Sequence, residues 1–305
     1  MTLIIAIAAL LLMTEDMPQE ASQANQATPV RVFYLGGQSN MDGYGFNSEL
    51  PSALSKVNRD VWIFHGNPAP DDDSAGGLGI WEPLQPGHGT GFSSDGISNS
   101  LSDRFGIELT LAAMLQELYP GEKIALIKYS RGGTSIDSLA ASHFGCWDPD
   151  YIGTAGINQY DHFLKTVHSA LSTRDIDRDG RPDLLIPSGI VWMQGESDAH
   201  TEDIASRYGM HLKRLMDLIR ASFHTDDLPV VIGKISDSWN DDDGKVWDYC
   251  ELVQYAQEKY VRSDANAAIV RSTRYYKYSD TWHYDSQGYL DLGEKFAEAI
   301  NTLDH

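Results

Sequence analysis

Two short segments near opposite ends of the chain contain residue types suited to nucleophilic catalysis. The run Gly36 to Met41 (GGQSNM) leaves Ser39 exposed in a turn after a predicted strand. The run Asp280 to His283 (DTWH) places an aspartate where it can accept the Nδ1 proton of the histidine and leave Nε2 free as a base. A serine hydroxyl is a poor nucleophile until an oriented base removes its proton. Each run alone also fits a plain polar turn, so the prediction requires a fold that brings Ser39, Asp280 and His283 together.

Two further segments offer hydrogen-bond donors for such a site. They are Ser130 to Ser135 (SRGGTS) and Gln194 to Asp198 (QGESD), and each follows a predicted strand. Glycine lets a backbone N–H group approach a developing oxyanion, and the Gln194 amide adds another donor. The GxSxG turn of α/β-hydrolases is absent, because Met41 occupies its last position. Four such segments together indicate catalysis much more strongly than any one of them.

The rest of the sequence alternates between short apolar runs and amphipathic stretches. The predicted strands are 31–35, 123–129, 189–193, 229–235 and 267–271, with a weaker sixth at 61–64. The predicted helices are 108–119, 158–171, 202–223, 246–261 and 287–303. This alternation predicts βαβ units around a parallel sheet in a single domain. Ligands of such sheets bind at the carboxyl ends of the strands, which is where three of the four segments lie. The fourth, Asp280 to His283, lies just before the last predicted helix.

Two long stretches, 67–104 and 134–156, show no periodicity and are predicted to be irregular. Structureless loops of this length in compact domains are usually functional or disordered. Because both stretches adjoin the carboxyl ends of predicted strands, we expect them to help form the site.

The segments GGQSNM, RGGTS, WMQGESD and DTWH together resemble those of the SGNH hydrolases. The nearest branch is carbohydrate esterase family six, with the sialate O-acetylesterase-like domain, and the resemblance runs from about Val30 to the end. It implies a three-layer α/β/α, flavodoxin-like fold with a central parallel sheet of about five strands. It also implies hydrolysis of acetyl esters on carbohydrates.

The resemblance also implies individual roles. Ser39 would be the nucleophile, His283 the base and Asp280 its orienting carboxylate. The oxyanion hole would comprise the backbone N–H groups of Ser39 and Gly132 with the Gln194 amide, although Gly133 could replace Gly132. Most of the superfamily carries Asn where this chain has Gln194, but Gln is usual in the carbohydrate esterase branch. Six neighbouring residues are expected to support the loops or contact substrate: Gln38, Asn40, Arg131, Gly133, Glu196 and Asp198.

The composition limits the classes of molecule that the protein can be expected to bind. The chain has 305 residues, with 23 basic and 44 acidic side chains, and a formal charge of -21. This excess argues against nucleic acid and anionic membranes, whose binding needs clustered Lys and Arg. Neutral substrates fit this charge balance better. The resemblance implies that the substrate is an acetylated carbohydrate. Catalysis is expected to need no cofactor, because the histidines show no HExxH or HxxxH pairing. The tryptophans 81, 147, 239 and 282 are predicted mostly to pack in the core or at the rim, although their faces could also hold sugar rings.

An acidic loop could hold a structural calcium ion. Asp175, Asp177 and Asp179 occupy positions 1, 3 and 5 of a D-x-D-x-D-G run, and Asp183 occupies position 9. Ile186 stands at position 12, so the bidentate glutamate of an EF-hand is missing. The alternative is an exposed acidic turn.

The N-terminus predicts export. Leu3 to Met13 is an apolar run of 11 residues without a preceding Lys or Arg, which suits a secretory signal better than a membrane span. We therefore expect a signal peptide at 1–24, a polar leader at 25–29 and one esterase domain at 30–305. The protein would then be secreted or periplasmic. The alternative for the apolar run is a buried or frayed terminal helix. Cys146 and Cys250 could pair.

The prediction is thus a serine esterase that removes O-acetyl groups from carbohydrates, of the acetyl xylan or sialate type, through an acetyl-enzyme. The alternatives are a non-catalytic glycan-binding domain on the same fold and a short-chain lipase or thioesterase of the same superfamily. A binding domain would not need Asp280 and His283 at their spacing. The sequence has no long apolar segment that could form a lid, which disfavours a lipid substrate.

Overall fold

The computed structural model describes residues 27–242 and 244–304. The predicted signal peptide therefore lies outside the described residues. Thr28 and Pro29, which we had assigned to the leader, instead begin the first strand. Their place in the sheet extends the domain by two residues at its N-terminal side.

A seven-stranded sheet forms the centre of the molecule, in the order β11-β10-β9-β1-β8-β3-β4. Its strands are β1 (Thr28–Gly37), β3 (Asn58–His65), β4 (Trp81–Leu84), β8 (Lys123–Ser130), β9 (Asp183–Met193), β10 (Val230–Gly233) and β11 (Ala267–Val270). All neighbours are parallel except β4, which runs antiparallel to β3. Two small antiparallel sheets join β2 (Gly45–Phe46) to β7 (Arg104–Phe105) and β5 (Ser93–Ser94) to β6 (Asn99–Ser100).

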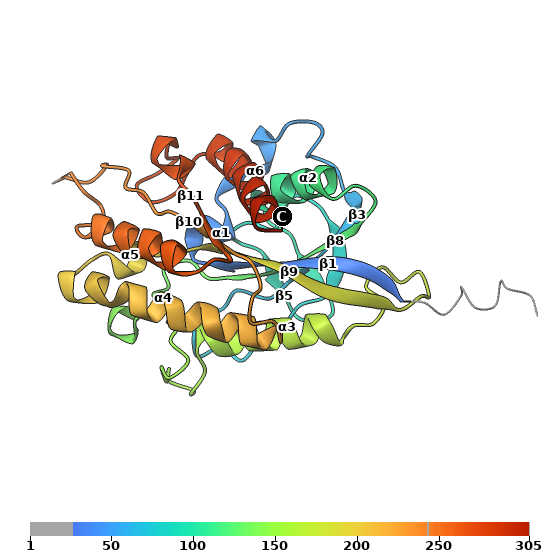
Figure 1. Cartoon of the computed structure of the whole chain (residues 1–305), viewed down its shortest axis with the longest axis horizontal. Helices are drawn as coiled ribbons and strands as arrows, with labels where there is room; N and C mark the ends of the chain where they lie inside the picture. The colour runs from blue at the N-terminus through green and yellow to red at the C-terminus, as the bar shows by residue number, and fades with distance from the viewer. Residues whose placement is uncertain (1–26, 243, 305) are drawn as a thin grey trace, which may run out of the picture.

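Helices cover both faces of the central sheet, as Figure 1 shows. α2 (Glu108–Leu118) and α6 (Ser286–Leu303) pack together on one face. α3 (Gln159–Ser172) and α4 (Glu202–Ser222) lie on the other, and α5 (Cys250–Ser263) packs against α4. The short elements are α1 (Ser39–Asp42) and the 3-10 helices η2 (Asn47–Glu49), η3 (Ser138–Ala140), η4 (Glu196–Asp198) and η5 (Ser272–Tyr275). The predicted three-layer α/β/α class is confirmed.

Three strands end at one level, which positions the site. β1 lies between β8 and β9, with Gly37 opposite Ser130 on one side and Met193 on the other. A Cβ atom on Gly37 would lie 2.0 Å from the Met193 carbonyl oxygen, so only glycine permits this approach. The segments that follow the three strands therefore leave the sheet at the same edge.

The structure corrects several details of the prediction. The sheet has seven strands rather than about five, and its first two parallel strands in the chain, β1 and β3, are separated by β8, unlike the order in flavodoxin itself. The stretch 67–104 is not structureless, because it contains β4 and the β5–β6 hairpin. Cys146 and Cys250 are both buried and free, so the two do not pair. No helix in 27–242 or 244–304 is long and apolar enough to cross a membrane.

Candidate active site

Ser39 lies directly after β1, at the first residue of α1, and its side chain is almost buried. The first N–H groups of a helix have no partner within that helix. The hydroxyl group faces a cavity of about 500 Å³ at the carboxyl edge of the sheet. Ser39 thus combines an accessible oxygen with backbone donors at one point.

His283 and Asp280 form a hydrogen-bonded pair on the loop before α6. The distance from His283 Nδ1 to Asp280 Oδ2 is 2.7 Å. Asp280 Oδ1 also accepts the backbone N–H groups of Trp282 and His283, each at 2.8 Å. The carboxylate therefore fixes both the backbone of the loop and the imidazole ring, and Nε2 is the ring nitrogen left for other contacts.

The two pKa values in this pair move down for different reasons. Burial lowers the pKa of His283, and the hydrogen bond with Asp280, which acts in the opposite sense, does not restore it. Burial tends to raise the pKa of Asp280, but the contact with the His283 ring and the hydrogen bonds from the Trp282 and His283 backbone N–H groups together outweigh it and leave that pKa below its usual value. At neutral pH the pair is therefore a neutral imidazole beside a carboxylate, which is the form a general base requires.

The fold brings the two segments together. Ser39 and His283 line the same cavity. Asn40 joins their loops directly, because its Nδ2 donates to the Trp282 carbonyl oxygen at 3.2 Å. Its Oδ1 accepts the Tyr289 hydroxyl of α6 at 2.8 Å. The predicted meeting of the two ends of the chain is present.

Gly132, rather than Gly133, lies against the serine. A Cβ atom on Gly132 would be 3.3 Å from the Cβ of Ser39, whereas one on Gly133 would meet the Phe144 ring at 2.4 Å. Gly133 has a φ of 72°, which suits its glycine. The backbone of Gly132 is thus the better placed of the two for an oxyanion formed at Ser39.

Gln194 does not occupy the place we expected. Its side chain is buried away from the cavity. Its Nε2 donates to the Thr134 carbonyl oxygen at 3.1 Å and to Asp198 at 2.6 Å. Both amide hydrogens are therefore used within the protein, and Gln194 has no donor left for an oxyanion. Its side chain instead holds the loops that follow β8 and β9.

Four of the six expected supporting residues, namely Gln38, Asn40, Glu196 and Asp198, are buried polar side chains at the cavity or next to it. Gln38 Oε1 accepts the N–H groups of Gly195 and Ser197 at 3.2 and 3.3 Å. Glu196 accepts Asn40 Nδ2 at 2.9 Å, and burial raises the pKa of Glu196. The contact is made by Glu196 Oε1, whereas Oε2 is buried without a hydrogen-bond partner among the described residues. The contact with Asn40 favours support of the Ser39 loop.

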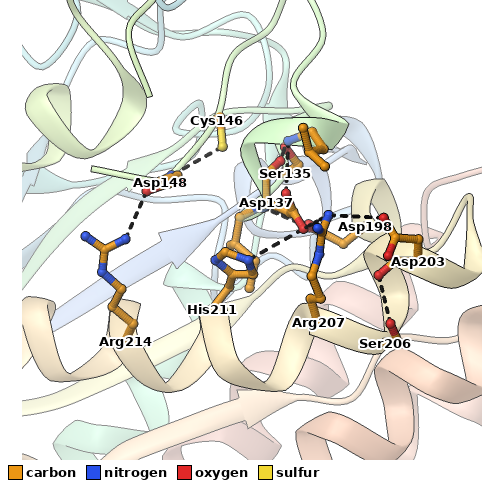
Figure 2. Close-up of polar contacts among 12 residues, drawn as sticks. Ser135, Asp137, Cys146, Asp148, Asp198, Asp203, Ser206, Arg207, His211 and Arg214 are labelled. Carbon is orange, nitrogen blue, oxygen red and sulfur yellow. Dashed lines mark hydrogen bonds and ion pairs between the residues drawn. The ribbon is translucent and has the colours of Figure 1, made fainter. Parts of the chain in front are cut away.

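Asp198 anchors the neighbouring loop, as Figure 2 shows. It accepts the N–H groups of Ile136 at 3.0 Å and Asp137 at 2.9 Å, and burial raises the pKa of Asp198 to about 7. The Asp137 side chain is in turn paired with Arg207 of α4 at 2.8 Å, with His211 Nε2 3.5 Å away. These contacts fix the segment after Gly132 to η4 and α4.

Several cavity residues were not predicted. They are Asp42, Tyr44, Thr90, Ser142, Phe144, Ser197, His200 and Trp247. Of the residues we did predict, Arg131 lines the cavity, with its guanidinium 5.3 Å from the centre of the Phe144 ring. Trp282 also lines it and is half exposed, whereas Trp81 and Trp147 are buried in the core and Trp239 is exposed elsewhere. Some of them had a sequence signal, because Asp42 and Tyr44 closely follow GGQSNM and Ser197 lies within QGESD. Thr90, Ser142 and Phe144 lie in the two long stretches that we expected to help form the site.

The acidic loop lies at the opposite end of β9 from the cavity. Asp175, Asp177 and Asp183 place one carboxylate oxygen each within 4.8 Å of the others, whereas Asp179 is not in this group. Asp175 accepts the backbone N–H groups of Asp179 and Gly180. Lys123 Nζ lies 2.7 Å from Asp177 and 3.7 Å from Asp183, so an ammonium group already neutralises part of the cluster.

The family model described as carbohydrate esterase, sialic acid-specific acetylesterase matches residues 29–302. The chain belongs to this family. It is accordingly a carboxylic ester hydrolase of the carbohydrate esterase class, which confirms the resemblance seen in the four segments. No protein of curated function matches the chain in sequence.

Solved structures share the fold of this carbohydrate esterase at low identity. A protein from Arabidopsis thaliana has a TM-score of 0.62 and 19% identity, covering 89% of this chain and 98% of its own. A carbohydrate acetylesterase from Xanthomonas citri has a TM-score of 0.60 and 16% identity, with 90% and 56% covered. NanS has a TM-score of 0.57 and 18% identity, with 90% and 98% covered.

Proposed function

We propose that this carbohydrate esterase removes O-acetyl groups from sugars through a Ser39–His283–Asp280 triad. The observation that carries the proposal is the placement of Ser39 and of the hydrogen-bonded His283–Asp280 pair around one cavity. The cavity combines Arg131 and polar side chains with the aromatic rings of Phe144, Trp247 and Trp282. Polar groups beside aromatic faces suit a sugar ring, which has hydroxyl groups at its edge and apolar faces.

In the proposed reaction, Ser39 Oγ attacks the acetyl carbonyl carbon while His283 Nε2 accepts the hydroxyl proton. The negative charge on the carbonyl oxygen is met by the backbone N–H groups of Ser39 and Gly132. His283 then returns the proton to the sugar oxygen as the carbon–oxygen ester bond breaks. Water, deprotonated by the same histidine, attacks the acetyl-serine and releases acetate.

The proposal is tested with Ser39→Ala and with Ser48→Ala as a matched exposed control. Ser39→Ala should lose about 1,000-fold or more of the hydrolysis of a chromogenic acetate, because no other group supplies the nucleophile. It should also resist labelling by a serine-reactive phosphonate, while its melting temperature stays near that of the wild type. Near-normal turnover by a folded Ser39→Ala protein would refute the triad and favour another role.

The identity of the acetylated sugar is tested separately from the triad. The two candidate substrates are acetylated xylan and O-acetyl sialic acid, and acetate release from the two, measured side by side, distinguishes them. Retention of glycans without acetate release from either, together with no phosphonate labelling, would favour the glycan-binding alternative.

A further inference from the structure

Tyr44 lies face to face with the candidate base. Its ring centroid is 3.5 Å from that of His283, and the two planes are within 5° of parallel. Tyr44 lines the cavity beside Ser39 and comes from the short segment between α1 and β2. The two rings are therefore in direct van der Waals contact, face against face.

The chain holds Tyr44 firmly in this position. Arg104 Nη1 donates to the Tyr44 carbonyl oxygen at 2.8 Å, and the same guanidinium lies 3.5 Å above the Phe46 ring. β2 pairs with β7, and the Phe46 N–H group donates to Ser286 Oγ at the start of α6 at 2.9 Å. The Tyr44 ring and the His283 loop are therefore attached to the same helix.

From this geometry we propose that Tyr44 is a positioning residue, which holds the His283 ring in the plane that joins Asp280 to Ser39 and stabilises the imidazolium formed in each step. The proposal rests on the proposed function, since it concerns the base of that triad. One ring edge is fixed by Asp280 Oδ2, and the stacked face of Tyr44 opposes tilting about that hydrogen bond. The negative face of an aromatic ring also attracts a cation placed over it.

The pH dependence of the reaction reports on this contact. The charged and titratable groups that act on His283 are Asp280 on its own loop, Asp42 of α1 and Arg104 of β7. Arg131, Glu196 and His200 line the same cavity. Because burial lowers the pKa of His283, the acid limb of kcat/KM should lie below the usual histidine value of 6.5. Loss of the aromatic face disfavours the imidazolium, so it should move that limb to still lower pH.

The test compares Tyr44→Phe, which keeps the ring, with Tyr44→Leu, which keeps bulk but removes the π face. Tyr44→Phe should retain most of the activity, although it loses a hydroxyl that contacts Thr90. Tyr44→Leu should lower kcat about 3- to 30-fold, the range of a cation–π contact. Its KM should change little, and its acid limb should lie below that of Tyr44→Phe.

Two results would overturn the proposal. One is a kcat and an acid limb equal to those of the wild type in both variants, which would leave the ring without a part in the reaction. The other is an equal loss in Tyr44→Phe, which would assign the effect to the hydroxyl. Tyr44→Met serves if Tyr44→Leu fails to fold, as judged by its melting temperature. A wild-type activity that survives Ser39→Ala is a failure of the triad itself, so the two failures are distinguishable.

Discussion

The carboxylate of Asp280 has three acceptor contacts on a single turn, and only one of them is to the imidazole. Two backbone N–H groups, from Trp282 and His283, shape the loop before the ring is oriented. This explains how a four-residue segment can orient the proposed base: the spacing of Asp280 and His283 forms the turn and the side-chain contact together. Tyr44 and Asn40 then place that turn against Ser39.

Asp280→Asn should lower kcat about 10⁴-fold while leaving the fold intact. An amide in this place can donate to Nδ1, which holds the neutral imidazole in the wrong tautomer for accepting the serine proton. The exposed Asp60→Asn on β3 is the matched control, and it should match the wild type. The measurement is kcat on a chromogenic acetate, with the melting temperature beside it. A loss of less than tenfold would show that Asp280 does not orient the base.

Local spacing singled out residues that the fold places around one cavity, and their catalytic roles stay predictions, whereas placement failed where a side chain depends on distant partners. Ser39, Asp280 and His283 belong to short segments with their own geometry. Gln194 stands at the expected strand end, but its amide turns toward Thr134 and Asp198. No sequence pattern near Gln194 predicts those two hydrogen bonds. The stacking of Tyr44 on His283 joins residues from opposite ends of the chain and is equally invisible in the sequence.

At the scale of elements, the parallel register of β1, β8 and β9 assembles the site. Runs of buried β-branched and aromatic residues predicted these strands, and amphipathic periodicity predicted α2 to α6. Prediction failed for β4, because Trp81–Leu84 is short, contains Pro83 and lies in a stretch without periodicity. An edge strand tolerates proline, since its outer N–H groups need no partner. The start of α5 was placed four residues too early, at Val246 instead of Cys250.

A fully buried ion pair joins these elements behind the cavity. Lys128 of β8 contacts Glu108 of α2 at 2.9 Å, and neither side chain is exposed. Lys128 Nζ also donates to the carbonyl oxygens of Asp42 at the end of α1 and of His88. Burial would raise the pKa of Glu108, but Lys128 outweighs it and holds that pKa below its usual value. The stability that this pair contributes is therefore present above the usual glutamate pKa and is lost as pH falls through the folded one.

Lys128→Met should lower the free energy of unfolding by about 3–5 kcal/mol at neutral pH, because it leaves the Glu108 carboxylate buried without its partner. The double variant Lys128→Met with Glu108→Gln should recover part of this loss. Urea unfolding of the two single variants and the double variant gives the coupling between the side chains. Simple addition of the two single effects would show that the pair makes no specific contribution.

At the scale of the whole molecule, the cavity and the acidic loop lie at opposite ends of β9. Calcium at Asp175, Asp177 and Asp183 remains a prediction. Ion binding to the folded state alone would raise the melting temperature, with a stabilisation of about 2.7 kcal/mol at 100 times the Kd. We expect calcium to raise the melting temperature relative to chelator, to do so less in Asp175→Asn, and to leave the esterase rate unchanged. Identical midpoints with calcium and with chelator would exclude the ion.

The contact between Asn40 and Trp282 has a consequence for the synthesis of this protein. Ser39, the proposed nucleophile, emerges early from the ribosome, whereas His283, the proposed base, emerges only after nearly all the intervening sheet and helices have been made. A product of premature termination would carry Ser39 in its turn but would lack both the base and the carbonyl oxygen of Trp282 to which Asn40 attaches. Partial chains are therefore expected to be inert toward esters, and acyl transfer begins only with a chain that has been synthesised past His283.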